Sequence, residues 1–351
     1  MKRYARGLVV GKFCPLHYGH EHVIDTALDV CDELFVLGYT RPEFDGCEPA
    51  ERRRWFGLRY PASRAANLHV LILGADEVPS ECARRGVSVP APAMPCNDDP
   101  EEHHREFCGW ICRELFGGSV DAVFTSEAYG EGFAASLARQ FGHPVDHVAV
   151  DPARAQVPAS GTALRRDPRA GRSLMAPEVY ASLVPRIALM GGESSGKTVL
   201  AHAVAQALGT VTVEEYGREL WVEQGGAVLS YEDLQRVAEV QVEREYRAAA
   251  LAPAGAAIVC DTTPLTTLFY SLKDHGAASS RLLELSRRRY TLNVLCEPDF
   301  PFVQDGTRRD AAFRAEQHAW YLERLSEHDA KLLRVEGSLA SRVDQVLRAL
   351  R

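Results

Sequence analysis

The sequence has no long apolar run and no recognisable leader. No stretch approaches the ~18 consecutive apolar residues of a membrane-spanning helix, so we expect no membrane span. The amino terminus passes from MKRYAR directly into the strand-like segment GLVV, without the apolar core of a signal peptide. These absences predict a cytoplasmic protein with reduced thiols.

Cysteine pairing motifs are also missing. The nine cysteines are odd in number and include no C-x-x-C pair, which argues against a disulfide framework and a zinc ribbon. Cys108 and Cys112 lie one helical turn apart, just after His103 and His104. A metal site is conceivable there. The ligand spacing of zinc sites is absent, however, so a helix with buried, apolar thiols is the favoured interpretation.

Positive charge is scarce. There are 40 basic and 48 acidic residues, which gives a formal net charge of −8. This balance argues against a protein that coats nucleic acid, and we expect no nucleic-acid partner. Only five residues are lysine, yet two of them, Lys12 and Lys197, lie in glycine-rich motifs. The length of 351 residues, with 46% hydrophobic and 25% charged residues, is typical of two globular domains.

Short apolar runs rich in β-branched residues alternate with helical patterns along the whole chain, which predicts an α/β protein with parallel sheets. The helical spacing is clearest at 231–250 and 310–330, and the Pro-rich segment 87–100 is predicted to be a surface loop. The expected strands are 7–10, 33–39, 69–74, 121–126 and 145–150 in the first half, and 186–190, 211–215, 256–260, 291–296 and 332–337 in the second.

The segment 165–185 contains Pro, Gly and Arg and has weak periodicity, so we place a domain boundary near its end. The two predicted domains are 1–184 and 185–351. Their glycine motifs differ in kind, and no internal repeat relates the halves.

The segment GGESSGKT matches the P-loop pattern G-x-x-x-x-G-K-[ST] and lies between an expected strand and an expected helix, the context that the motif requires. Its glycines let the backbone wrap a phosphate with inward-pointing N–H groups. We expect Lys197 to reach the β- and γ-phosphates and Thr198 to ligate Mg²⁺. The predicted ATP-binding residues here are Gly191, Gly192, Glu193, Ser194, Ser195, Gly196, Lys197 and Thr198.

Acidic residues follow two other strands of this half. Asp261 comes directly after the strand 256–260 and suits the Mg²⁺ shell or a substrate hydroxyl, although capping of the next helix is the alternative. The string VEEYGRE supplies Glu214, Glu215 and Arg218 after the strand 211–215, where small-molecule kinases place groups that bind the acceptor.

The string FPFVQDGTRRD follows the strand 291–296. Its Asp-Gly turn and the pair Arg308 and Arg309 suit a mobile lid whose guanidinium groups neutralise a transferring phosphate. A solvated surface loop is the alternative interpretation.

The first half carries a different phosphate motif. GKFCPLHYGH follows the first strand and contains His17-Tyr18-Gly19-His20 at the start of an expected helix. Two imidazoles at a helix N-terminus form a donor-rich pocket that can bind phosphate oxygens. A second motif, SGTALR at 160–165, is predicted to be a helix N-cap turn with Arg165 one turn later, and together the two motifs suit a triphosphate.

The pair HYGH and SGTALR resembles the H-x-G-H and S-x-T-x-x-R motifs of the nucleotidylyltransferase superfamily. The ordered strings GKFCPLHYGH, TSEAYGEGF, VDPARAQVPASGTALRRDP, GGESSGKT, EEYGRE and FVQDGTRR resemble the bifunctional nicotinamide-nucleotide adenylyltransferase/ribosylnicotinamide kinase family of NadR type, from about Gly7 to Arg309. The resemblance implies a Rossmann-like nucleotidylyltransferase domain followed by a P-loop kinase domain. It also implies ATP and Mg²⁺ as cofactors, bound NAD as a product, and homo-oligomers.

The resemblance implies two reactions. The second domain would phosphorylate nicotinamide riboside to nicotinamide mononucleotide (NMN) with ATP, and the first would join NMN to AMP from ATP, giving NAD and pyrophosphate. The implied catalytic residues are His17, His20, Arg165, Lys197 and Asp261. The implied ATP and NMN contacts of the first domain are Gly11, Lys12, Phe13, His17, His20, Arg54 (in the segment 52–55), Trp110, Ser160, Thr162 and Arg165. In the kinase domain, Arg308 would contact ATP, Thr198 and Asp261 the metal, and Glu215, Tyr216, Arg218, Asp261, Phe302, Asp305 and Gly306 the riboside.

Two departures from the family pattern stand out. Enteric members carry an N-terminal DNA-binding segment, whereas this chain begins at the first strand, so DNA binding is not expected. Related sequences often read D-T-D where this one has Asp261-Thr262-Thr263. The missing second acid leaves the general base open between Asp261 and Glu215.

Two other functions remain as alternatives. A fused phosphopantetheine adenylyltransferase and dephospho-coenzyme A kinase would pair the same superfamilies in the same order, although the strings EEYGRE and TSEAYG disfavour it. A non-catalytic NAD or ATP sensor would keep both folds without turnover, although the full set of phosphate-binding residues disfavours it.

Overall fold

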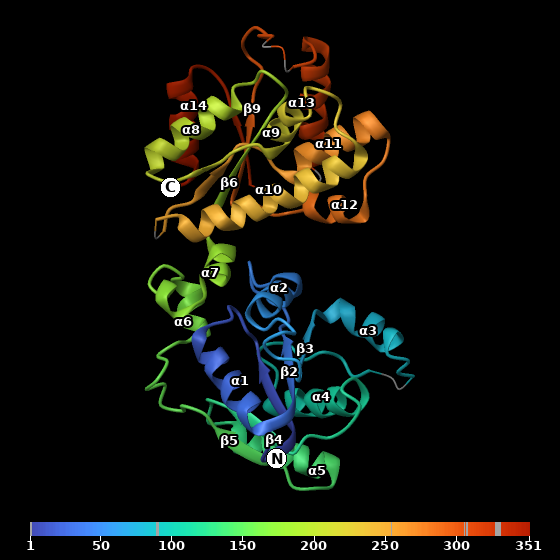
Figure 1. The fold of residues 1–351 in the computed structure, drawn as a ribbon. Coiled ribbons are helices and arrows are strands. Elements are labelled where there is room, and N and C mark those ends of the chain that lie inside the picture. Colours follow the sequence, from blue (N-terminus) through green and yellow to red (C-terminus); the bar gives the residue numbers. More distant parts are fainter. Residues whose placement is uncertain (1, 89–90, 254, 305, 307, 327–330) are drawn as a thin grey trace. The chain divides into compact units, whose positions relative to one another are not determined.

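The computed structural model describes the chain except residues 1, 89–90, 254, 305, 307 and 327–330. It divides into two compact units, Met1–Ser182 and Leu183–Arg351, against an expected boundary between residues 184 and 185. Each unit has one five-stranded parallel sheet (Figure 1). Among the described residues, no helix combines the length and the apolar character that a membrane crossing requires.

The first unit has the strand order β3-β2-β1-β4-β5. The order reverses beside β1, so the loops after β1 and β4 meet at the carboxyl edge of the sheet, where α/β folds bind ligands. The elements are β1 (Tyr4–Gly11), α1 (Tyr18–Val30), β2 (Cys31–Tyr39), α2 (Pro49–Arg59), β3 (Leu68–Leu73), η1 (Ala75–Glu77), α3 (Val78–Arg84), α4 (Glu101–Glu114), β4 (Ala122–Thr125), α5 (Gly130–Phe141), β5 (Asp146–Ala149), α6 (Gly161–Arg166), η2 (Arg172–Leu174) and α7 (Pro177–Leu183).

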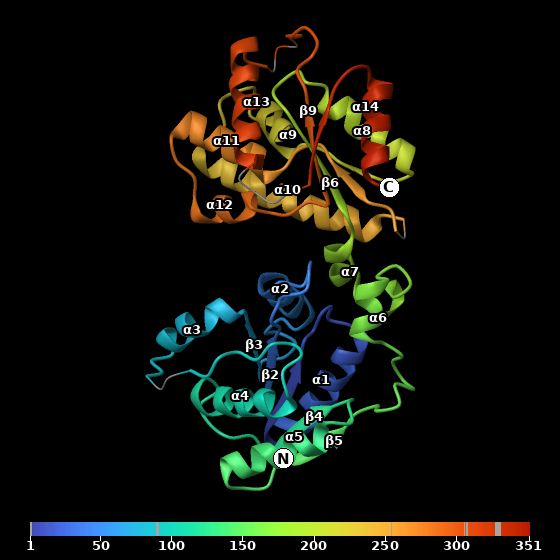
Figure 2. The same ribbon diagram turned by 180° about the vertical axis from the view of Figure 1, so that it is seen from behind.

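The second unit has the strand order β10-β9-β6-β8-β7 (Figure 2). Its central strand, β6, leads directly into the P-loop. The elements are β6 (Arg186–Met190), α8 (Lys197–Leu208), β7 (Thr212–Val213), α9 (Tyr216–Glu223), α10 (Tyr231–Leu251), β8 (Ile258–Cys260), α11 (Pro264–His275), α12 (Ser280–Ser286), β9 (Leu292–Cys296), α13 (Ala311–Ser326), β10 (Leu332–Val335) and α14 (Leu339–Ala349).

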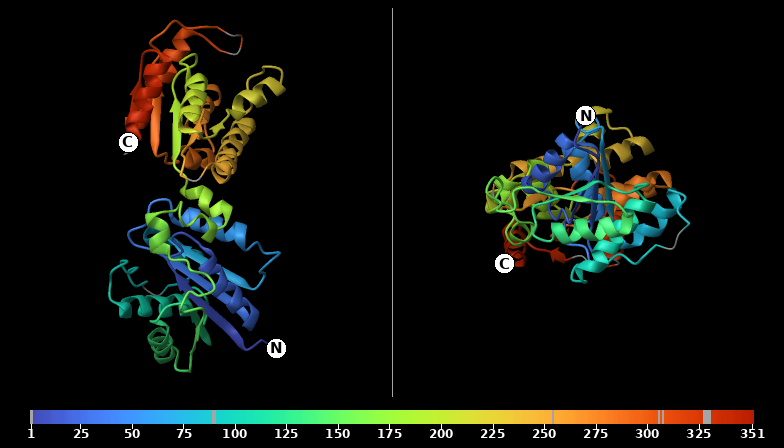
Figure 3. Two further views of the ribbon diagram at one scale, coloured as in Figure 1. Left: turned by 90° about the vertical axis from the view of Figure 1, so that its left-hand side faces the viewer. Right: turned by 90° about the horizontal axis from the view of Figure 1, so that it is seen from below.

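Helices cover both faces of each sheet (Figure 3), which explains the continuous apolar runs of the central strands. In β2 the consecutive residues 34–37 are buried, and in β6 all five residues are buried. Side chains on both faces of such strands lose contact with water, so alternation of polar and apolar residues disappears. The predicted α/β class with two parallel sheets is confirmed.

All ten expected strands are present, although β1 is longer than expected, with eight residues against four, and β7 is shorter. β7 contains only two residues, against five expected. The reason is Gln241 of α10, which donates from Nε2 to the carbonyl of Glu214 (3.2 Å) and accepts from the N–H of Tyr216 (3.0 Å). The buried amide draws the chain out of the sheet and into α9.

The two long helices predicted from periodicity are also present. α10 begins after Ser230, whose hydroxyl accepts from the N–H of Asp233, and α13 covers 311–326 of the expected 310–330. Residues 327–330 lie outside the described residues. The predicted loop 87–100 contains no helix or strand among its described residues, but Met94 is buried within it. Cys108 and Cys112 are buried in α4 as part of the apolar core.

Candidate active sites

The first candidate site contains His17 and His20, which together form a capping box at the N-terminus of α1. The N–H of His20 donates to Nδ1 of His17 (3.3 Å), and the N–H of His17 donates to Nδ1 of His20 (3.4 Å). The two rings stack with centroids 3.6 Å apart, and Phe13 contacts the His20 ring edge-on at 5.0 Å. Because Nδ1 of each ring accepts, the neutral rings carry their protons on Nε2.

Both imidazoles are held in the neutral form. Burial, reinforced by the charge of Arg154, lowers the pKa of His17 from 6.5 to about 4. Burial lowers the pKa of His20 well below its usual value, and His17 lowers it further. The pair therefore offers two neutral Nε2–H donors at neutral pH. Such donors can bind phosphate oxygens without transferring a proton to them.

The depressed pKa predicts an acid-sensitive first unit. Between pH 6.5 and about 4 the unfolded chain binds a proton at His17 that the folded chain excludes, so folding should lose about 3 kcal/mol as the pH falls through this range. We expect an NMR titration to place the midpoint of His17 near pH 4, and His17→Asn, which keeps a capping side chain, to flatten the loss of stability. A His17 midpoint near 6.5 would contradict the role of burial.

Three cationic side chains surround the loop between β1 and α1. Arg165 donates from Nη1 to the carbonyl of Cys14 (2.5 Å), and its guanidinium lies 4.1 Å from the ring centroid of Phe44. Lys12 approaches the same ring at 5.8 Å, and burial followed by the charge of Arg165 lowers the pKa of its amine. Arg52, fully buried, donates to the carbonyl of Lys12 (3.2 Å).

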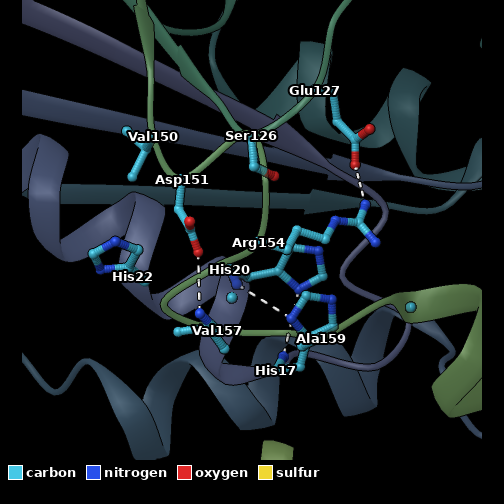
Figure 4. Close-up of a pocket in the computed structure, with 12 residues that line it drawn as sticks. His17, His20, His22, Ser126, Glu127, Val150, Asp151, Arg154, Val157 and Ala159 are labelled. Carbon is cyan, nitrogen blue, oxygen red and sulfur yellow. Dashed lines mark hydrogen bonds and ion pairs between the residues drawn. The ribbon is translucent and has the colours of Figure 1, made fainter.

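The second motif of this unit comes to the same place. Ser160 is the N-cap residue of α6, as predicted, and Arg165 donates from Nη2 to the hydroxyl of Thr162 (3.2 Å). A hollow at the carboxyl edge of the sheet joins this motif to the histidines (Figure 4). Its lining residues are His17, Gly19, His20, His22, Ser126, Glu127, Val150, Asp151, Arg154, Val157, Ala159 and Gly161.

Of the ten described residues predicted to contact ATP and NMN, His17 and His20 line this hollow and the other eight do not. Arg54 faces Ser182 (Nη1 to Oγ, 3.5 Å) and Glu51 on α2, whereas its neighbour Arg52 contacts the histidine loop. Trp110 lies in the apolar core with 7% of its surface exposed, so its ring offers little area for stacking on a ligand. Gly11 ends β1, where a Cβ would meet the ring of Phe13 at 3.0 Å.

The second candidate site is the P-loop between β6 and α8. Gly191 and Gly196 have positive φ angles of 147° and 81°, and a Cβ on Gly192 would lie 2.5 Å from the carbonyl oxygen of Arg314. Only glycine fits these conformations and this close approach. Lys197 donates from Nζ to the carbonyls of Gly191 (3.0 Å) and Gly192 (3.1 Å), so its amine lies across the loop.

Asp261 is the buried acid beside the P-loop. It follows β8, its side chain is 2% exposed, and its Oδ1 has no hydrogen-bond partner among the described residues. Burial raises the pKa of Asp261 to about 6, against the opposing effects of a hydrogen bond from Thr198 and the charge of Lys197. An unpartnered carboxylate oxygen beside a threonine hydroxyl is a donor set that fits Mg²⁺.

Three residues predicted to contact the riboside lie at the start of α9. Glu215 is the N-cap residue of α9, and Arg218 approaches its carboxylate at 3.4 Å. Tyr216 is buried against Leu220 and Val237, so it faces the apolar interior.

The segment after β9 meets the P-loop at Ser194. The Ser194 hydroxyl accepts from the N–H of Val303 (3.1 Å) and from Nη1 of Arg308 (3.3 Å). Arg309 instead forms an ion pair with Asp274 on α11 (2.7 Å). Phe302 lies 5.5 Å from the guanidinium of Arg314, Gly306 is an exposed turn glycine, and Asp305 lies outside the described residues.

Some contacts that support the P-loop were not predicted, including those of Glu193, which the motif itself named as an ATP-binding residue. Glu193 accepts from the hydroxyl of Tyr270 (2.9 Å) and from the N–H of Arg309 (2.7 Å), which links the loop to α11 and to the segment after β9. Arg342 of α14 is 3% exposed and donates from Nη1 to the carbonyl of Ser195 (2.9 Å). No motif predicted these contacts, because each joins residues far apart in the chain.

The chain is similar to known proteins over most of its length. The model of the AAA domain family matches residues 186–342. The trifunctional NAD biosynthesis/regulator protein NadR of Escherichia coli (strain K12) is 27% identical over 347 residues, covering 94% of this chain and 78% of that protein. The protein of the same description from Salmonella typhimurium (strain LT2) is 26% identical over 328 residues, covering 86% and 71%.

Solved structures show the same fold. A crystal structure of a NadR protein in complex with NAD and AMP-PNP matches with a TM-score of 0.57 at 19% identity, covering all of this chain and 96% of that chain. A crystal structure of a NadR protein in complex with NR matches with a TM-score of 0.56 over 98% of this chain. The sequence similarity over most of the chain, together with the shared fold, establishes that this chain is homologous to the NadR proteins.

Proposed function

We propose that the chain is a bifunctional enzyme of NAD biosynthesis. The second unit phosphorylates nicotinamide riboside with ATP to give NMN, and the first unit joins NMN to AMP from a second ATP, releasing pyrophosphate. The observation that carries the proposal is the presence of both phosphate-binding centres, in the NadR order, in a chain homologous to NadR proteins over 94% of its length.

The names of the relatives support this assignment. The similar enteric proteins are described as NAD biosynthesis proteins, and the structurally similar NadR proteins bind NAD, AMP-PNP and NR. AMP-PNP is an ATP analogue, so these ligands correspond to the proposed substrates and product. The same relatives favour NAD precursors over coenzyme A precursors as substrates of this chain.

In the first unit, adenylyl transfer needs positioning and charge stabilisation rather than a covalent intermediate. The NMN phosphate is already an anionic nucleophile that attacks the α-phosphorus of ATP in line, and pyrophosphate leaves. The Nε2–H groups of His17 and His20 would donate to phosphate oxygens as negative charge shifts to the leaving group. Lys12 and Arg165, which lie beside Phe44 at the loop between β1 and α1, would balance the remaining negative charge of the phosphates.

In the second unit, the primary hydroxyl of the riboside attacks the γ-phosphorus of ATP. Lys197 would exchange its two loop carbonyls for phosphate oxygens, and Arg308 would approach from the segment after β9. Thr198 would hold Mg²⁺, which when bound neutralises charge on the phosphates.

We propose Asp261 rather than Glu215 as the group that takes the hydroxyl proton. Asp261 is buried beside Lys197 with a pKa raised to about 6, which suits proton transfer near neutral pH. Glu215 is engaged by Arg218 at the start of α9.

The pH dependence of the kinase tests this choice. Because a base must be ionised, kcat/KM for ATP should fall about tenfold per pH unit below about pH 6. Asp261→Asn should lower kcat by roughly 10²–10⁴-fold, whereas Glu215→Gln should keep the acid limb of the profile. Loss of the acid limb in Glu215→Gln, with Asp261→Asn still active, would assign the base to Glu215 instead.

Product analysis by chromatography tests the function as a whole. The purified protein is incubated with nicotinamide riboside, ATP and Mg²⁺, and we expect NAD to appear with NMN as its precursor. NMN without NAD would contradict the role of the first unit. No product with the riboside, but turnover of dephospho-coenzyme A or phosphopantetheine, would identify the coenzyme A enzyme. Nucleotide binding without released pyrophosphate or ADP would identify a sensor.

A further inference from the structure

Arg154 lines the same hollow as the histidine pair, although none of the motif patterns assigned it a role (Figure 4). Its charge reaches both imidazoles, since it lowers the pKa of His17 and of His20. It is the one arginine among the described residues that line the hollow. The two imidazoles are neutral, so Arg154 supplies the formal positive charge of this cavity.

The loop that carries Arg154 is built to hold it in place. The carboxylate of Asp151 accepts from three successive N–H groups, those of Ala155 (2.8 Å), Gln156 (3.0 Å) and Val157 (3.0 Å). Asp151 and Arg154 have φ angles of 47° and 52°, and this left-handed conformation costs about 1–2 kcal/mol for a residue with a side chain. Strain of this kind concentrates at binding sites, where surrounding hydrogen bonds maintain it.

Glu127, directly after the end of β4, orients the guanidinium. Arg154 donates from Nη2 to Oε1 of Glu127 (2.7 Å), and the two side chains are 38% and 47% exposed. An exposed pair of this kind contributes little to stability. Nε and Nη1 of Arg154 donate to no described residue. These two nitrogens of the planar guanidinium can therefore donate to a ligand in the cavity.

We propose that Arg154 is a further substrate-binding residue of adenylyl transfer, which donates to the ATP phosphates while Glu127 holds the guanidinium in position. The inference rests on the proposed function of the first unit. A guanidinium presents several N–H donors in one plane, which matches the oxygens of a phosphate. His17, His20 and Gly161 line the same cavity, so the phosphates it receives are those of ATP rather than that of NMN.

The kinetic test follows NAD formation from NMN and ATP, which isolates the first unit from the kinase. Arg154→Ala should raise KM for ATP by about 10–100-fold, the loss expected for charge-assisted hydrogen bonds, with little change in KM for NMN. Glu127→Gln, whose amide oxygen still accepts from Nη2, should have a much smaller effect. Arg139→Ala removes a surface arginine of α5 that pairs with Glu102, and serves as the matched control.

A comparison of Arg154→Ala with Glu127→Ala distinguishes a role of Arg154 in ATP binding from a purely structural role. If Arg154 only fastens its loop to Glu127, Arg154→Ala and Glu127→Ala will raise KM equally, and the proposal is wrong. A rise in KM for NMN alone would also overturn it. Circular dichroism and thermal unfolding of each variant, compared with the wild type, report whether the first unit is folded.

A binding measurement keeps the inference testable if the proposed function fails. Wild-type protein that forms no NAD would contradict adenylyl transfer but not ATP binding in the hollow. In a Lys197→Ala background, which weakens the P-loop site, calorimetry with ATP should then show at least about tenfold weaker binding after Arg154→Ala. Equal affinity with and without Arg154 would overturn the inference whatever the catalytic result.

Discussion

Lys197→Ala should lower riboside phosphorylation by about 10²–10³-fold or more, while adenylyl transfer stays within about twofold of the wild type. The amine of Lys197 lies across the P-loop on the carbonyls of Gly191 and Gly192, where an incoming phosphate would replace those carbonyls. Its loss removes the one positive side chain that the motif itself supplies. Because the two centres lie in separate compact units, the effect should be confined to the kinase.

Two activities measured on one preparation make this test internally controlled. NMN formation from the riboside reports the kinase, and NAD formation from added NMN reports the adenylyltransferase. Lys273→Ala is the matched control, because Lys273 lies on α11 of the same unit and pairs with Glu316 at the surface (2.5 Å). If Lys197→Ala abolished both activities in a folded protein, the two-site proposal would be wrong.

His20→Ala should produce the converse result. We expect adenylyl transfer to fall by about 10²–10³-fold, the usual loss when one preorganised donor to a developing charge is removed, and riboside phosphorylation to persist. The substitution removes the Nε2–H donor and the stack on His17, whose centroid is 3.6 Å away. It also removes half of the reciprocal cap of α1, at a cost of about 1 kcal/mol in stability.

The loss of the cap must be separated from the loss of the donor. His20→Asn keeps a side chain that can accept at the cap but presents no imidazole, so its melting temperature should recover while adenylyl transfer stays low. His143→Ala, in the exposed turn after α5, removes a histidine of the same unit that does not line the hollow, and serves as the control. Recovery of activity together with stability in His20→Asn would show that His20 acts only as a cap.

The sequence predicted the fold well because both sheets are parallel and doubly covered. Each strand is a short apolar run between helical patterns, and each phosphate motif follows the end of a strand. Local sequence patterns are therefore enough to place the strands, the helices and the two motifs along the chain. The exception is β7, whose length depends on Gln241, 25 residues beyond Tyr216 in the chain. A side chain that pairs with backbone at such a distance has no local signal.

The candidate sites were predictable only where their residues belong to contiguous motifs. His17, His20 and Lys197 belong to motifs that follow strands, Asp261 comes directly after β8, and all four were identified from their neighbours in the sequence. Arg54 and Trp110 were carried over from a family resemblance, and their burial and contacts depend on how α2 and α4 pack.

The sequence by itself determined the class of fold, the order of the two units and the two phosphate motifs, since these depend on hydrophobic periodicity and on glycine and histidine spacing. Tertiary structure decided which charges meet. Arg52 rather than Arg54 contacts the histidine loop, Arg308 rather than Arg309 reaches Ser194, and Arg154 enters the hollow beside His17. Neighbouring arginines are equivalent in a sequence, and only the packing of distant segments fixes which guanidinium finds a carboxylate, a carbonyl or a phosphate.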